Sequence, residues 1–140
     1  MRSAFRNTTS VLFVAVLAQI GFAGYGAFRA IHAADHHAVT KKTIESGFDI
    51  HGVLGAAIVL ALVLLVLIAA VGRLGGIELR ASGVLAALGI LQGVLGAVST
   101  SVPALGFLHA MNALAILAVT GWLAHRLGSE HRLAAKATGA

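Results

Sequence analysis

The chain has 140 residues, of which 59% are hydrophobic and only 11% are charged, and its mean hydropathy is +0.94. A soluble domain carries about 25% charged residues, so this composition excludes an ordinary soluble protein and predicts one domain, residues 1–140, within a lipid bilayer. The lack of cysteine excludes disulfides, iron–sulfur clusters and thiol nucleophiles. Basic residues flanking membrane helices explain the net charge of +5, so nucleic acid is not an expected partner.

Four long apolar blocks organise the chain, at residues 10–31, 49–72, 82–102 and 104–124. Each has about the 20 residues that a helix needs to cross a bilayer. The short alternating strands that build a transmembrane barrel are missing. We therefore predict an all-α integral membrane protein, a four-helix bundle in up-down-up-down order.

The first block also has features of a signal peptide. The segment MRSAFRNTTSVLFVAVLAQIGFAGYGA has a basic start, an apolar centre and small residues at its end. Its apolar run is long for a signal, however, and the block has a counterpart later in the chain. We therefore favour a retained transmembrane helix over a cleaved segment.

Gln19 and Gln92 mark that internal repeat. The first block contains VLAQIGFAGYG and the third contains ILQGVLGAVS, each with a glutamine in mid-block and small residues after it. The small residues are Gly21 and Gly24 in the first block, and Gly93 and Gly96 in the third. Both glutamines are candidate cofactor contacts, and hydrogen bonding within the bundle is the alternative role, which we favour.

The second and fourth blocks repeat a histidine near the outer end of each predicted helix. They contain HGVLGAAIVLAL and HAMNALAILAV, in which Gly55 follows His51 by four residues and Ala113 follows His109 by four. The matching residues predict two copies of one helical hairpin. The first copy has the longer outer loop, HAADHHAVTKKTIESGF.

Basic residues are distributed unequally between the two ends of the predicted bundle. Seven flank the end that holds both termini: Arg2, Arg6, Arg73, Arg80, Arg126, Arg132 and Lys136. Three flank the other end: Arg29, Lys41 and Lys42. The positive-inside rule then predicts both termini in the cytoplasm. The membrane that we expect for this multi-pass protein is the bacterial cytoplasmic membrane, which the family resemblance given below implies.

His51 and His109 are the leading candidates for a functional site. Their helices are parallel and diagonal in such a bundle, so the imidazoles are expected to face one another near the outer leaflet. Zinc takes four ligands, and Asp49 points elsewhere on the helix because it is only two residues from His51. A haem needs just two axial ligands. The pair therefore predicts one bis-histidine haem b, with His51 and His109 bound to the iron.

Small residues predict the flat space that a haem requires. Gly55 and Ala113 lie one turn deeper than the histidines, and the four glycines after Gln19 and Gln92 are expected to thin the walls. Ordinary small-residue helix packing is the alternative, but the coincidence with paired histidines favours a haem slot. The three basic residues at this end are candidate partners of the haem propionates, or ordinary loop residues.

The remaining five histidines are expected to be ordinary polar residues. His125 and His131 lie at the cytoplasmic end beside arginines. His32, His36 and His37 are expected in a solvated outer loop, where a surface metal site with Asp35 is the alternative.

Two segments resemble one four-helix half of the haem A synthase family. LQGVLGAVSTSVPALGFLHAMNALAIL is similar to its third-to-fourth-helix segment, and HGVLGAAIVLALVLL is similar to the start of its second helix. The resemblance implies that His51 and His109 are the axial ligands of one haem. This chain has only one such half, and it has Phe48 where the haem-modifying half has a glutamate.

The sequence thus predicts a small membrane b-type cytochrome that transfers electrons, rather than an enzyme with synthase chemistry. A redox partner or a larger membrane complex is the expected contact besides lipid, and homo-oligomerisation is left open. The alternative is a haem-free scaffold or accessory subunit of a larger respiratory-type membrane complex.

Overall fold

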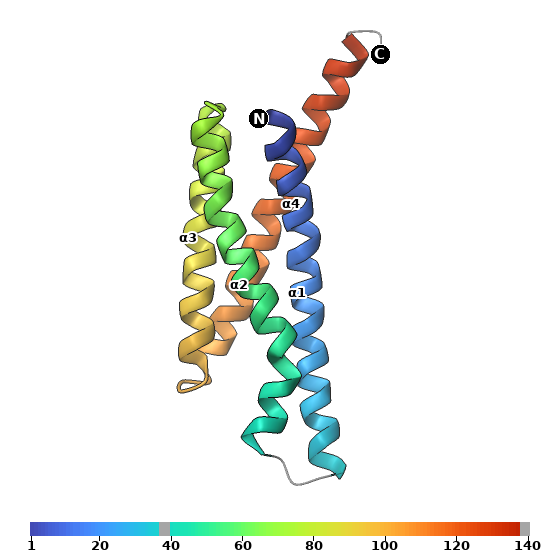
Figure 1. Cartoon of the computed structure of the whole chain (residues 1–140), viewed down its shortest axis with the longest axis vertical. Helices are drawn as coiled ribbons and strands as arrows, with labels where there is room; N and C mark the ends of the chain where they lie inside the picture. The colour runs from blue at the N-terminus through green and yellow to red at the C-terminus, as the bar shows by residue number, and fades with distance from the viewer. Residues whose placement is uncertain (37–39, 138–140) are drawn as a thin grey trace.

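A computed structural model describes residues 1–36 and 40–137, and it confirms the four-helix bundle (Figure 1). The helices are α1 (Arg2–His36), α2 (Lys41–Val71), α3 (Gly76–Ser99) and α4 (Leu105–Ala137). No strand occurs within the described ranges. All four helices are long and apolar enough to cross a membrane.

The helices extend beyond the apolar blocks, both at the end of α4 and around the expected outer loop. The hydroxyl of Thr40 accepts a hydrogen bond from the Thr43 backbone at 3.2 Å, which caps α2 and starts it well before the second block. At the other side of this loop α1 continues to His36, so His32 and His36 lie in its last turns and the prediction that they belong to a loop is wrong. His37 lies outside the described residues.

The helices pack as a square, with neighbours in the order α1, α2, α3, α4 and back to α1. As predicted, α2 and α4 face each other across a diagonal. We call the end that holds the two termini and the α2–α3 turn the termini end, and the opposite end the hairpin end. At the hairpin end, the α1–α2 hairpin extends beyond the α3–α4 hairpin (Figure 1).

A dense apolar core fills the half of the bundle nearest the termini end. Its fully buried large side chains are Phe5, Leu62, Leu65, Leu85 and Leu123. Lipid tails are as apolar as leucine, so these side chains stabilise the bundle through close van der Waals contact rather than through the hydrophobic effect. The half nearest the hairpin end has smaller side chains, and its packing is more open.

Glycines allow close approach at all four helix–helix contacts. The pairs are Gly26 with Gly47 between α1 and α2, Gly89 with Leu62 between α2 and α3, Gly96 with His109 between α3 and α4, and Gly121 with Phe13 between α1 and α4. The absence of a side chain at these positions lets backbones and large side chains meet, as is usual in membrane bundles.

The Gly26–Gly47 contact positions the start of α2. A Cβ atom on Gly26 would lie 2.8 Å from the backbone oxygen of Gly47, and 2.8 Å from Cδ1 of Phe48. His51 follows Gly47 by one helical turn. The close crossing therefore determines where His51 enters the bundle.

Apolar side chains cover the outside of the bundle. Phe28, Val53 and Phe107 are 75%, 74% and 69% exposed, and each helix presents similar residues. Such a surface is far too apolar for a monomer in water. Together with the four spanning helices, it identifies a multi-pass membrane protein.

Replacing Gly26 tests this packing. We expect Gly26→Leu to lower the free energy of unfolding in detergent by about 1–3 kcal/mol, because its side chain overlaps Gly47 and Phe48. Gly24→Leu is the control, since the space beyond Gly24 is open. Thermal unfolding monitored by circular dichroism compares the stability of the two variants. Equal stability would contradict the proposed role of the Gly26–Gly47 crossing.

Candidate functional site

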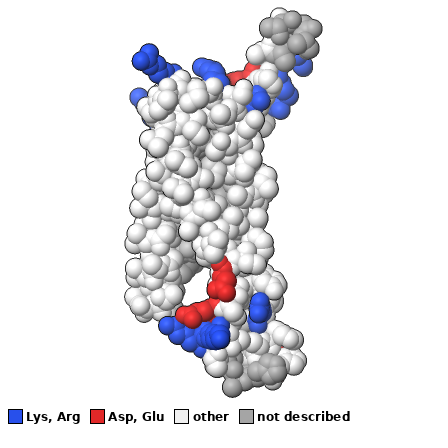
Figure 2. All heavy atoms as spheres, in the orientation of Figure 1, with Lys and Arg blue, Asp and Glu red and all other residues white. Residues whose placement is uncertain are grey.

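A cavity of about 570 Å³ occupies the half of the bundle nearest the hairpin end. All four helices line it, and the molecular surface is hollowed at this end beside acidic side chains (Figure 2). Most of the lining is apolar. The polar lining residues are Gln19, His51, Gln92, Ser99, Thr100 and His109.

Small residues form much of the cavity wall. They include both predicted small neighbours of the histidines, Gly55 and Ala113, together with Gly52, Gly93, Gly96 and Gly106. The prediction that Gly21 and Gly24 thin the wall is wrong, because both are exposed and neither lines the cavity. Their face of α1 points away from the bundle.

His51 and His109 meet inside this cavity from opposite corners of the bundle. Their ring centroids are 6.2 Å apart and the ring planes are inclined by 60°. A metal–imidazole bond is about 2 Å long, so two rings that bind one metal ion from opposite sides have their centres about 6 Å apart. The separation of the two rings therefore suits a shared metal ion.

Each imidazole is held by a glutamine backbone carbonyl on the neighbouring helix of its own hairpin. Nδ1 of His51 lies 3.1 Å from the backbone oxygen of Gln19, and Nδ1 of His109 lies 3.2 Å from the backbone oxygen of Gln92. A carbonyl only accepts, so each Nδ1 carries a proton, and in the neutral ring Nε2 then carries the lone pair. Metal-binding histidines are commonly oriented in this way.

The side-chain amides of the two glutamines bond differently. The Gln19 amide donates to the backbone oxygen of His51 at 2.7 Å. The Gln92 amide lies 3.1 Å from Nε2 of His109 and donates to it, since that nitrogen is an acceptor. Both glutamines thus hydrogen-bond between adjacent helices while they also line the cavity.

Asn112 completes the half of the site that α3 and α4 form, although the sequence pattern predicted no role for it. Its amide nitrogen donates to the Gln92 side-chain oxygen at 2.6 Å and to the Leu88 backbone oxygen at 2.9 Å. An asparagine in an apolar block, three residues from His109, was the available signal. Its partner on α3 could not be predicted, because the contact depends on how the two helices are rotated about their own axes.

The half of the site that α1 and α2 form has no side chain that donates to its glutamine in this way. Within the described ranges, the side-chain oxygen of Gln19 is the one buried side-chain polar atom without a hydrogen bond. The residue three positions after His51 is Leu54, which has no donor. The Gln19 amide cannot simply be reversed, because its oxygen would then face the carbonyl of His51.

Phe48 also contacts the site. It lines the cavity, and its ring lies edge-on to His51 with the centroids 6.2 Å apart. Aromatic packing of this kind restricts the imidazole without adding a charge. Asp49, by contrast, is exposed and does not line the cavity, as predicted from its spacing.

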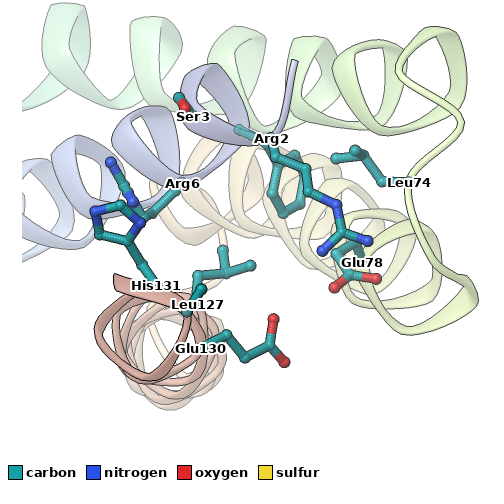
Figure 3. A pocket seen from close by; sticks show the side chains of 10 residues that line it. Arg2, Ser3, Arg6, Leu74, Glu78, Leu127, Glu130 and His131 are labelled. Atoms are coloured by element: carbon teal, nitrogen blue, oxygen red, sulfur yellow. The ribbon is translucent and has the colours of Figure 1, made fainter. Parts of the chain in front are cut away.

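A second, smaller cavity of about 200 Å³ lies at the termini end. Arg2 points toward Glu78 there, and His131 also lines the space (Figure 3). A neighbouring carboxylate, Glu130, is paired with Arg126 at 3.0 Å. This mixture of both charges is typical of the interfacial end of a membrane bundle.

The other histidines do not join a larger ligand set. His32 and His36 pack with ring centroids 4.3 Å apart on exposed turns of α1. Across the described ranges, no group of three or more histidine, aspartate or glutamate side chains is placed to hold a metal ion. The three basic residues of the hairpin end, Arg29, Lys41 and Lys42, do not line the large cavity.

The chain matches no protein-family model, and comparison with curated proteins and with solved structures finds no match either. The resemblance to one half of the haem A synthase family therefore stays a prediction. The function has to be argued from the geometry of the site.

Removing each glutamine amide should have different effects on stability. Gln92→Leu breaks two side-chain hydrogen bonds, to His109 and from Asn112, so we expect a loss of about 1 kcal/mol in unfolding free energy. Gln19→Leu breaks one bond but also removes an unpaired buried oxygen, so its effect should be near zero. Unfolding by SDS titration in mixed micelles compares them, and equal losses would argue against these assignments.

Proposed function

We propose that this protein is a small b-type cytochrome of the membrane, with one haem held between α2 and α4 by His51 and His109. The observation that carries the proposal is the pair of imidazoles, 6.2 Å apart, in a cavity lined by small residues from all four helices. The resemblance to a haem-binding half of the haem A synthase family supports the same assignment.

The donor set fits a haem better than a bare metal ion. The cavity offers two neutral imidazoles, and a haem supplies the four remaining ligands itself. The glycine positions along α2 and α3 keep Cβ atoms out of the space around the rings. The carbonyls of Gln19 and Gln92 accept from Nδ1–H of the two rings, so Nε2 is the nitrogen of each neutral imidazole that would coordinate iron.

Electron transfer is the activity that this arrangement favours. A bound haem supplies one-electron chemistry at its iron. His51 and His109 would hold the haem iron from both faces, which would leave no position for oxygen or substrate. Most of the lining around the rings is apolar, and the Nδ1 hydrogen bonds to Gln19 and Gln92 would hold the rings in one orientation during electron transfer.

Synthase chemistry has little support in this site. Phe48 stands where the haem-modifying half of the family has a glutamate, and its ring packs edge-on against His51. No carboxylate lines the large cavity within the described residues. We therefore assign the protein as an electron carrier or a subunit of one, whose contacts are lipid, a redox partner and, as an open question, further copies of itself.

The charge distribution supports an orientation with both termini in the cytoplasm of a bacterial cell (Figure 2). Seven basic and two acidic residues flank the termini end, while three of each flank the hairpin end, so all of the net charge of +5 lies at the termini end. The positive-inside rule places that end in the cytoplasm. The proposed haem then lies toward the outer leaflet.

A reporter fusion tests the orientation. Alkaline phosphatase, which is active only outside the cytoplasm, should stay inactive when fused to the C-terminus. A fusion within the turn between Ser99 and Leu105 should be active. The reverse pattern would invert the protein and move the proposed haem to the cytoplasmic leaflet.

An optical spectrum tests the cytochrome itself. The reduced, purified protein should show the sharp visible bands of a six-coordinate, low-spin b-type haem. His51→Ala and His109→Ala should each remove one axial bond and weaken haem retention roughly tenfold or more. His36→Ala and His125→Ala are controls that should retain the wild-type spectrum, since neither residue lines the cavity.

Two results would contradict the proposal. One is wild-type protein without absorbance beyond the protein band, even when haem is supplied during expression. The other is a low-spin spectrum that survives in both ligand variants. Loss of haem in the His125 variant would instead indicate a second site near the termini end.

A haem-free accessory subunit of a larger membrane complex is the second candidate. Gly21 and Gly24 favour it, because they are exposed on α1 with open space beyond them. Exposed small residues of this kind admit close packing by a helix of another protein. Absence of haem from the wild-type protein would make this candidate the leading one.

A further inference from the structure

The two halves of the site treat their histidines differently, although they repeat the same carbonyl–imidazole bond. In the α3–α4 half, the Gln92 amide donates to Nε2 of His109 at 3.1 Å. In the α1–α2 half, the Gln19 amide donates to the backbone of His51 instead, at 2.7 Å. No hydrogen bond reaches Nε2 of His51 from any described residue.

A single methyl group accounts for the difference. A Cβ atom on Gly55 would lie 2.8 Å from the Gln19 amide nitrogen, so the amide occupies space that only glycine leaves open. The corresponding residue of the second half is Ala113, four positions after His109, and it carries that methyl group. The Gln92 amide is therefore excluded from the equivalent place and turns to the imidazole.

Asn112 then fixes the Gln92 amide in this orientation. Its nitrogen donates to the Gln92 side-chain oxygen at 2.6 Å, which leaves the Gln92 nitrogen facing His109. Leu54, the corresponding residue of the first half, has no such donor. Positions 54 and 55, compared with 112 and 113, thus encode the asymmetry.

We propose that His51 and His109 are unequal ligands: Nε2 of His51 is open, whereas Nε2 of His109 is capped by Gln92. The inference rests on the proposed haem function and adds the order in which the two histidines would bind. His51 would bind the iron of a haem first, and His109 would bind it only after the Gln92 amide had turned away. Gln92 is a positioning residue that holds His109 through this hydrogen bond.

Variants that keep only one of the two histidines measure how much the Gln92 hydrogen bond slows hemin binding. His109→Ala keeps only the open histidine, and His51→Ala keeps only the capped one. When hemin is mixed with purified, haem-free protein in detergent, stopped-flow absorbance should show about fivefold or more faster binding to the His109→Ala protein. That factor corresponds to one hydrogen bond broken before ligation.

A second substitution in each variant should remove the amide hydrogen bond to the remaining histidine or create one. Gln92→Leu in the His51→Ala background should raise the rate to that of His109→Ala. Gly55→Ala in the His109→Ala background should slow binding by a similar factor, because the new methyl group displaces the Gln19 amide toward the His51 ring. Equal rates in the two single-ligand variants, unchanged by Gln92→Leu, would overturn the inference.

A measurement without haem separates this inference from the proposed function. In haem-free protein labelled with ¹⁵N-histidine, Gln92→Leu should shift the Nε2 resonance of His109 toward that of an unbonded ring nitrogen. Gln19→Leu should leave Nε2 of His51 in place. An unshifted His109 resonance refutes the cap even if haem binds, while failure of wild-type protein to bind hemin refutes the haem function alone.

Discussion

A carbonyl oxygen inside a helix accepts one hydrogen bond from the N–H four residues on and keeps a second lone pair. Gln19 and Gln92 each offer this lone pair to the Nδ1–H of a histidine on the adjacent helix. In an apolar surrounding, an unpaired ring N–H would be strongly unfavourable. These two bonds therefore determine the tautomer, the ring direction and the meeting point of His51 and His109.

Glycine serves two opposite purposes around these bonds. Gly26 and Gly47 bring α1 and α2 into direct backbone contact, and Gly96 accommodates the ring of His109. Gly52 and Gly93 line the large cavity, and a Cβ on either would meet nothing within 4 Å. The same residue type thus closes the helix contacts and keeps the space between them open, which explains a dense core beside a hollow site.

The features that the sequence predicted well are those encoded in long or repeated patterns. The four apolar blocks determined the helix number and the diagonal placement of α2 and α4, and the repeated histidine spacing identified His51 and His109 as neighbours. Helix ends were missed where a local cap such as Thr40 continues a helix through polar residues.

Features that depend on the rotation of a helix were not predictable. A glycine has no side chain whose polarity would indicate which face of a helix it occupies, so Gly21 and Gly24 were assigned to the wrong side of α1. Asn112 was visible in the sequence, but its bond to Gln92 depends on how α3 and α4 are turned. The different roles of the two glutamines depend on Leu54 and Gly55 in one hairpin and on Asn112 and Ala113 in the other.

The location of the carbonyl–imidazole bonds within single hairpins has a consequence for biosynthesis. Gln19 and His51 are 32 residues apart, and Gln92 and His109 are 17 apart, so each bond forms between consecutive membrane segments. The first hairpin contains everything needed to orient its own imidazole before α3 and α4 have left the ribosome. Assembly of the site is then the lateral association of two preformed hairpins, with little loop closure left to complete.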